Sequence, residues 1–249
     1  MAYTLTQSIN WAQTYIEYSP LTAGTNSEPA ITMASMIRST ILNSPFTWPW
    51  NRAEYVINTP NTPASLTAGA QDYTFTITDF AYLEKISLLS ADGTYGFEIQ
   101  DVHNTNILGI SGTTSAAQAQ PNSAAVKLYT PSTSVSLRFL SVPDQAYTGV
   151  ITYQKLALPF ATVGDPWSPI PDSFMDIFNN LFLAEAMEAV DDARGQYYRQ
   201  RGIAALLAKS EGLSDMQRNA FLSQWIARGT SQQMSAQLRV QQAQQARGI

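Results

Sequence analysis

The chain has 249 residues, of which 45% are hydrophobic and 13% charged, with a formal net charge of -5 and no cysteine. This composition is typical of a folded chain with a substantial core, and it excludes intrinsic disorder, disulfide bonds and thiolate metal sites. No apolar run approaches the roughly 20 residues that span a bilayer, and the first residues lack the basic and apolar regions of a secretory signal, so we expect neither feature.

Two short helices are predicted near the N-terminus, over about residues 5–16 and 29–42. Thr4 and Gln7 have the spacing of a capping box at the start of the first helix. Pro45 is expected to end the second helix, because a proline disfavours the helical conformation of the residue before it.

Aromatic residues mark two places in this N-terminal region. Trp11, Tyr15 and Tyr18 recur at helical spacing, and we expect this stripe to lie in the core. The segment 48–52, Trp-Pro-Trp-Asn-Arg, cannot continue a helix. Its two tryptophans are expected to fill a junction between the helices and the following domain. A platform on which a sugar or a base stacks is the alternative interpretation.

From about residue 53 to residue 160, short β-branched and aromatic stretches alternate with turn residues. Asp92-Gly93 between two of these stretches is typical of a hairpin turn. The pattern predicts an inserted antiparallel β-sandwich or barrel. Its expected strands cover residues 54–58, 73–77, 83–89, 96–100, 125–129, 135–140 and 149–156.

Three more helices are predicted in the C-terminal part. The first begins at about residue 172, the second covers about residues 196–210 and the third covers about residues 214–228. The first of them carries three acidic residues at i, i+3 and i+7: Glu185, Glu188 and Asp192. Like charges near a helix C-terminus are unfavourable, so a basic partner is expected. The candidate cations, from the same chain or from a neighbouring subunit, are Arg194, Arg199 and Arg201.

Together these elements predict an α+β fold. The N- and C-terminal segments form a helical bundle, the antiparallel β-sandwich or barrel is inserted between them, and an extended tail closes the chain. The predicted limits are 1–52 for the N-terminal helices, 53–160 for the β-domain, 161–229 for the C-terminal helices and 230–249 for the tail.

The charge is divided unevenly along the chain. Residues 1–193 carry 6 Lys and Arg against 17 Asp and Glu, a net charge of -11, whereas residues 194–249 carry 8 against 2, a net charge of +6. A basic end on an acidic body suggests an acidic partner or head-to-tail self-association, and nucleic acid is the competing interpretation. The glutamine-rich tail has too few apolar residues to fold alone, so we expect it to order on a partner. A frayed terminus is the alternative.

No motif for catalysis, a cofactor or a metal is found in the sequence. The single histidine, His103, follows Asp101 by two residues, but no second His or Cys completes a metal site. A nucleophile elbow, a phosphate-binding loop and a dinucleotide fingerprint are all missing. Acidic pairs such as Asp191 and Asp192 leave a glycosidase open as a minor alternative. We therefore expect no catalytic residue, no cofactor and no metal, and a protein that is not an enzyme.

Three features together resemble the head-to-tail connector proteins of tailed bacteriophages, the adaptor, ring or tail-tubular type. The first is the N-terminal helix pair that ends in segment 48–52, and the second is the inserted β-domain. The third is segment 169–174, Pro-Ile-Pro-Asp-Ser-Phe, followed by a helix with Ala-Glu-Ala at 184–186 and a helix with Tyr-Tyr at 197–198. The overlap is one of architecture across nearly the whole chain.

The resemblance implies a structural virion protein that is made in the host cytoplasm and located at the head–tail interface. It forms a homo-oligomeric ring, commonly a dodecamer, which docks on the portal protein and meets the next connector or tail protein. DNA passes through its lumen without specific binding during genome ejection, and no membrane is involved. The alternative is another tail or baseplate structural protein whose β-domain binds carbohydrate.

The resemblance also gives two sets of candidate interaction residues. In long-tailed phages the C-terminal segment of the adaptor often embeds in the portal. The corresponding portal-binding candidates are Met234, Leu238, Arg239 and Arg247. In a ring, opposite charges on facing sides of neighbouring protomers attract one another. The inter-subunit candidates are Glu185, Glu188, Asp192, Arg194, Arg199 and Arg201.

Overall fold

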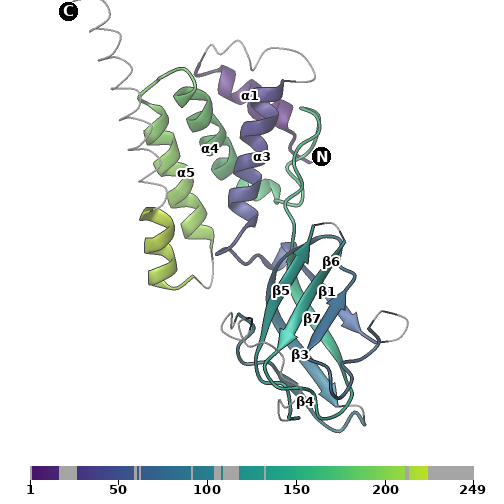
Figure 1. Ribbon diagram of the computed structural model, residues 1–249. Coiled ribbons are helices and arrows are strands. Elements are labelled where there is room, and N and C mark those ends of the chain that lie inside the picture. The colour runs from purple at the N-terminus through teal and green to yellow at the C-terminus, as the bar shows by residue number, and fades with distance from the viewer. Residues whose placement is uncertain are drawn as a thin grey trace, which may run out of the picture. The chain divides into compact units, whose positions relative to one another are not determined.

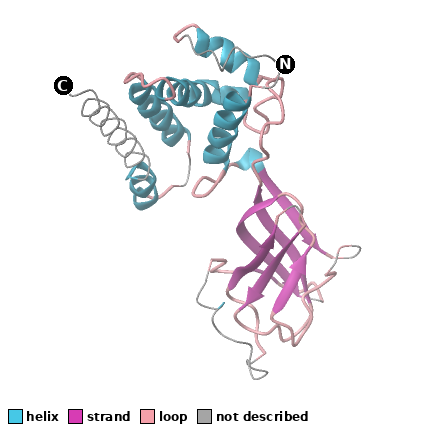
Figure 2. Cartoon of the chain, turned by 45° about the horizontal axis from the view of Figure 1, so that its top comes forward, coloured by secondary structure: helices cyan, strands magenta, loops and turns pink. Residues whose placement is uncertain are grey.

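A computed structural model describes residues 2–16, 27–58, 61, 63–90, 92–103, 108, 118–131, 133–210 and 213–223. The chain divides into two compact units. Residues 1–41 and 158–249 make the first, called the helical unit, and residues 42–157 make the second, called the β-unit. Figure 1 labels their elements, and Figure 2 shows the helices in cyan and the strands in magenta. The protein therefore belongs to the α+β class, with helices and antiparallel sheets.

The predicted helices are confirmed. They are α1 (Leu5–Gln13), α3 (Glu28–Leu42), α4 (Met175–Glu188), which follows the short 3-10 helix η3 (Asp172–Phe174), and α5 (Gly195–Lys209). Residues 215–223 are helical as well, and the last residues of the helix predicted over 214–228 lie outside the described residues. In the described part of the chain, no helix is long and apolar enough to cross a membrane.

Local side-chain chemistry sets several helix ends. The capping box at α1 is confirmed, with the Thr4 backbone N–H donating to the Gln7 side chain at 2.8 Å. A second capping box joins Ser214 and Gln217 at the start of the last described helix. The α1 helix ends at Gln13, earlier than predicted, because both the backbone N–H and the hydroxyl of Thr14 donate to the Trp11 carbonyl.

Residues 3–6 and 163–167 meet inside the helical unit through backbone hydrogen bonds. The N–H of Leu5 donates to the carbonyl of Asp165 at 3.0 Å, and that of Thr6 donates to Val163 at 2.8 Å. The N–H of Trp167 returns a bond to the carbonyl of Tyr3 at 3.0 Å. These contacts join segments more than 150 residues apart, so one unit contains both termini of the described chain.

Trp167 is the largest fully buried side chain of the helical unit. Its ring stacks on Phe178 with the centroids 4.4 Å apart and meets Phe160 edge-on at 5.0 Å. The indole N–H donates to the Ser8 hydroxyl at 2.9 Å, so its polar atom is satisfied inside the core. The Trp167 side chain thus connects α1, α4 and the segment that precedes η3.

Arg38 of α3 is also buried in this unit. Its guanidinium lies 3.5 Å from the centroid of the Phe160 ring and donates to the carbonyls of Leu158 and Pro166. Burial lowers the pKa of Arg38 to about 10, and the nearby Asp165 carboxylate partly offsets this effect. The Arg38 side chain therefore fastens segment 158–166 to α3.

The β-unit contains two antiparallel sheets. The four-stranded sheet has the order β1-β7-β3-β4 and the three-stranded sheet the order β2-β6-β5. All seven predicted strands are confirmed: β1 (Arg52–Ile57), β2 (Asp72–Phe75), β3 (Phe80–Ser90), β4 (Gly96–Glu98), β5 (Ala124–Thr130), β6 (Ser134–Phe139) and β7 (Tyr147–Lys155). Inward residues of both sheets share one apolar cluster, which includes Ile57, Phe75, Phe80, Leu137, Phe139 and Ile151.

The predicted hairpin between β3 and β4 is confirmed. Gly93 has a φ of 70°, a conformation that glycine adopts without steric cost. The Asp92 carboxylate accepts hydrogen bonds from the Thr94 N–H at 3.1 Å and from the Ser90 hydroxyl at 2.5 Å. The turn brings Leu89 opposite Gly96 and starts the pairing of the two strands.

The tryptophans of segment 48–52 belong to an aromatic stack in the β-unit. Phe46, Trp48 and Trp50 stack in sequence with centroid separations of 5.7 and 5.5 Å. The backbone of Trp48 exchanges two hydrogen bonds with the Gln154 side chain of β7, at 3.2 and 3.1 Å. Trp48 is only 3% exposed, so its ring does not offer an open stacking platform for a sugar or a base.

An ion cluster joins the three strands of the smaller sheet. Asp72 of β2 accepts a two-bond contact from Arg138 of β6 at 2.7 and 2.8 Å, and Lys127 of β5 donates to it at 2.5 Å. These hydrogen bonds lower the pKa of Asp72 to about 2, and the bond from Arg138 has the largest effect. The ionised carboxylate therefore stabilises the folded β-unit.

Replacing Asp72 with asparagine is expected to lower the free energy of unfolding at neutral pH by less than about 1 kcal/mol, because exposed ion pairs contribute little. A lowered pKa means that this stabilisation is present above the ordinary pKa of about 3.9. It is lost as the pH falls through the native pKa of about 2. Urea titrations of both proteins at a series of pH values check this. A difference that stays constant down to about pH 2 would contradict the assignment.

Candidate functional site

The α4 and α5 helices approach one another closely because two glycines of α5 face α4. A Cβ atom on Gly202 would lie 2.9 Å from two side-chain carbons of Leu181, and one on Gly195 would lie 3.0 Å from the carbonyl of Ala184. No side chain fits at either position without displacing its neighbour. The two glycines thus bring the acidic side of α4 within reach of the α5 side chain between them, Arg199.

Arg199 is almost fully buried, with 7% of its side chain exposed. Its Nη2 atom donates to Glu185 at 3.0 Å and to Glu188 at 2.5 Å. Glu185 and Glu188 of the predicted acidic row are thus neutralised by α5 of the same chain, which was the first of the two alternatives. The prediction that Asp192 belongs to the same helix is wrong, because α4 ends at Glu188. A buried cation with two carboxylates is costly to disrupt, because the remaining charges lose their partner.

Glu188 is the second carboxylate that Arg199 contacts, and only 19% of its side chain is exposed. Burial raises its pKa, Arg199 lowers it, and the neighbouring carboxylate of Glu185 raises it. One Glu188 oxygen accepts the bond from Arg199, whereas the other is buried and accepts no hydrogen bond from the described residues. Glu188 is therefore poised to take up a proton when the compensating cation is removed.

Asp192 and Arg194 form a separate pair in the turn between the two helices. The Arg194 guanidinium donates to both carboxylate oxygens of Asp192 at 2.6–3.1 Å, and the Arg194 backbone N–H donates to the same carboxylate at 2.9 Å. The side-chain bond is the main cause of the lowered pKa of Asp192. The preceding Asp191 has a φ of 56° and occupies the position at which helices often carry glycine.

The structure thus brings five of the six predicted inter-subunit residues into ion pairs within one chain. Arg201 is exposed and forms no ion pair with the residues that the structure describes. A contact between subunits at this face remains a prediction. It would depend on Arg201 and on the exposed side of Arg194, because Arg199 is already enclosed by Glu185 and Glu188.

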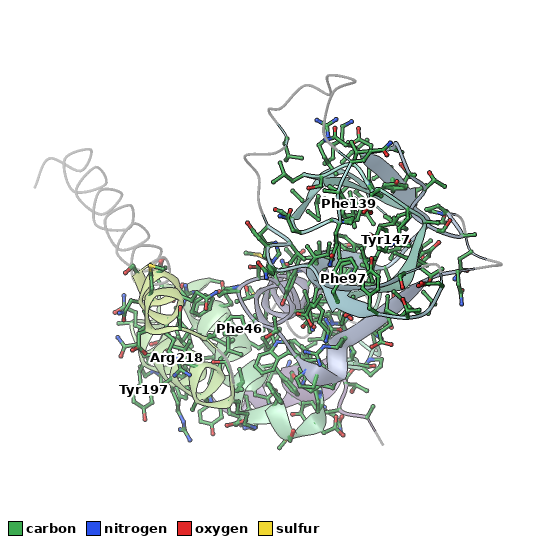
Figure 3. The ribbon with its side chains drawn as sticks, turned by 90° about the horizontal axis from the view of Figure 1, so that it is seen from below. Phe46, Phe97, Phe139, Tyr147, Tyr197 and Arg218 are labelled. Carbon is green, nitrogen blue, oxygen red and sulfur yellow. The ribbon has the colours of Figure 1, made fainter. Side chains whose placement is uncertain are left out.

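A chain of four aromatic rings crosses from α1 to α5. The centroid distances are 5.0 Å for Trp11–Tyr15, 5.9 Å for Tyr15–Tyr198 and 5.3 Å for Tyr198–Tyr197. Tyr197 is 62% exposed and lies at the outer side of the helical unit in Figure 3. Tyr15 is exposed as well, so the prediction that this stripe lies in the core is wrong at Tyr15. The predicted third member, Tyr18, lies outside the described residues.

His103, the single histidine, lies in a simple local environment. His103 is exposed, and its backbone N–H donates to the Asp101 carboxylate at 3.1 Å. Among the residues that the structure describes, no group of three or more His, Cys, Asp and Glu side chains is placed to hold a metal ion.

The predicted portal-binding residues Met234, Leu238, Arg239 and Arg247 lie outside the described residues. A scan against protein-family models and a search of curated proteins found no match to this chain. The functional interpretation therefore depends on the sequence and on the geometry given above.

Proposed function

We propose that this protein is a structural virion protein, a ring-forming head-to-tail adaptor of a tailed bacteriophage. The observation that carries the proposal is the division of the chain, in which the helical unit contains both ends and the β-unit lies between them in sequence. This is the arrangement of the connector proteins that the chain resembles. We further propose that the helices form a bundle and that the two sheets, which share one apolar cluster, form a β-sandwich.

In this proposal the protein is not an enzyme. A ring of copies, a dodecamer by analogy, docks on the portal protein, extends the DNA channel and receives the next connector or tail protein. The net charge of -11 over residues 1–193 supports a channel through which DNA slides, because a basic lining would retain the phosphate backbone. The basic tail is proposed to bind the portal. Residues 224–249 contain three arginines and no acidic residue.

A chain truncated after Gly229 is expected to lose binding to portal-bearing capsids and to keep its unfolding midpoint. Four substitutions in the full-length chain separate the two kinds of contact: Met234→Ser with Leu238→Ser for the apolar part, and Arg239→Gln with Arg247→Gln for the charged part. Co-sedimentation with capsids measures binding, and electron microscopy of the particles shows whether a ring forms. A truncated chain that binds as well as the full-length chain would refute the role of the tail.

The second candidate is another tail or baseplate structural protein with a carbohydrate-binding β-domain. One exposed aromatic residue favours it: Tyr95 stacks on Phe97 at 6.1 Å, and the Gln145 side chain donates to the Tyr95 hydroxyl at 2.7 Å. Phe97 in turn packs edge-on against Tyr147, and both residues are labelled in Figure 3. The same truncation separates the candidates, because a carbohydrate-binding protein would keep its glycan binding without the tail.

A further inference from the structure

The outward face of the four-stranded sheet contains a hollow of about 340 Å³. On this face Val150 of β7 lies opposite both Val56 of β1 and Ser87 of β3, and all three residues line the hollow. Two apolar rim residues remain open to solvent, Val56 at 40% and Leu89 at 41% exposure. The hollow is therefore an apolar depression that accommodates an aliphatic side chain.

The outward face of the three-stranded sheet carries a projection instead. Leu128 of β5 lies opposite Ser136 of β6, which lies opposite Thr74 of β2. The hydroxyls of Thr74 and Ser136 form a hydrogen bond with each other at 2.7 Å. The side chains beside Leu128 are therefore short, and their polar groups already have a partner. Leu128 is 61% exposed, the highest value for a large apolar side chain in the described part of the β-unit.

The two faces also carry opposite net charge. The first has two cations against three anions: Arg52, Lys85, Glu54, Glu84 and Glu98. The second has two cations against one anion: Lys127, Arg138 and Asp72. Within the described residues Glu54, two positions before Val56 on β1, makes no ion pair. Lys127 is the direct neighbour of Leu128 and shares the single carboxylate of Asp72 with Arg138, so the cationic excess of this face lies beside Leu128.

We propose that a second copy of this chain occupies the hollow. Leu128 of one protomer packs against Val56, Leu89 and Val150 of the next, and Lys127 approaches Glu54. The two faces differ, so the contact is heterologous and repeats from copy to copy, which generates a ring when the rotation closes. The inference rests on the proposed ring function and assigns a ring contact to the β-unit.

Cysteine pairs provide a direct test, because the natural chain has no cysteine. The full-length double variant Val56→Cys with Leu128→Cys is assembled on portal-bearing capsids and mildly oxidised. The expected product is a ladder of disulfide-linked oligomers, which neither single variant can form. The matched control pairs Leu128→Cys with Leu158→Cys, a residue of the helical unit that is 64% exposed, and is expected to give no ladder.

A second variant tests the contact without cross-linking. Leu128→Asp places a carboxylate in the hollow beside Glu54 and is expected to abolish ring assembly at an unchanged unfolding midpoint, whereas Leu158→Asp assembles normally. Rings that form without a ladder, or with Leu128→Asp, would overturn the proposed contact and leave the adaptor function standing. A natural chain that neither forms rings nor binds capsids would overturn both.

Discussion

Replacing Arg199 with methionine is expected to lower the free energy of unfolding by about 3–5 kcal/mol, because it leaves two carboxylates in a partly buried site without their cation. The Arg199 side chain is 7% exposed, and those of Glu185 and Glu188 are 22% and 19% exposed. Methionine keeps most of the apolar contacts of the arginine stem, so the charge is the main quantity changed. Urea titration followed by far-UV circular dichroism measures the loss.

The pH dependence of the Arg199→Met variant separates a charge effect from a packing effect. Burial already raises the pKa of Glu188, and removal of the cation raises it further. A carboxyl whose folded pKa is raised stabilises the protein below its unfolded pKa and loses that contribution as the pH rises through the folded pKa. The variant is therefore expected to regain part of its lost stability as the pH falls from neutral toward the ordinary glutamate pKa of about 4.3.

Replacing Glu188 with the neutral glutamine provides the matched control. Adding Glu188→Gln to Arg199→Met removes one of the two stranded carboxylates, and the double variant is expected to be more stable than Arg199→Met alone. Its stability should also depend less on pH in the same range. Equal stabilities for the single and double variants would show that Arg199 acts through packing rather than through its charge.

The sequence predicted the elements well where local chemistry alone decides them. The strands followed from alternation and turn residues, and the capping box of Thr4 and Gln7 followed from spacing, because these signals depend on residues that are adjacent or three apart. The apolar residues of α4 recur at helical spacing, and Ile177, Phe178, Leu181 and Phe182 are all buried.

Contacts between distant segments were not predictable in the same way. Arg38 is a single cation on an apolar helix, a pattern typical of a surface residue, and only the fold brings the carbonyls of Leu158 and Pro166 to it. The acidic row on α4 indicated that a cation is needed but not which one, since spacing along one helix says nothing about its neighbour. The separation of Gly195 and Gly202 by seven residues on one helix face was the available signal for close packing of α4 and α5.

Gly149→Ala is expected to destabilise the β-unit by about 3 kcal/mol, the upper part of the range for overpacking. A Cβ atom at this position would lie 2.1 Å from the carbonyl oxygen of Ser87 and 2.9 Å from the Cα atom of Leu88. Both are backbone atoms of β3, which pairs with β7 at this register, so neither can move away without separating the two strands.

Gly96→Ala is the matched control for this prediction, because it adds the same methyl group to another strand of the same sheet, β4. There the new Cβ atom would lie 3.5 Å from the Leu88 carbonyl, an ordinary van der Waals contact, and the expected change is within about 0.5 kcal/mol. Hydrogen exchange of the β3 and β7 amides compares the two variants and localises the effect. Unchanged protection in Gly149→Ala would contradict the prediction, because it would show that the pairing of β3 and β7 accommodates the added methyl group.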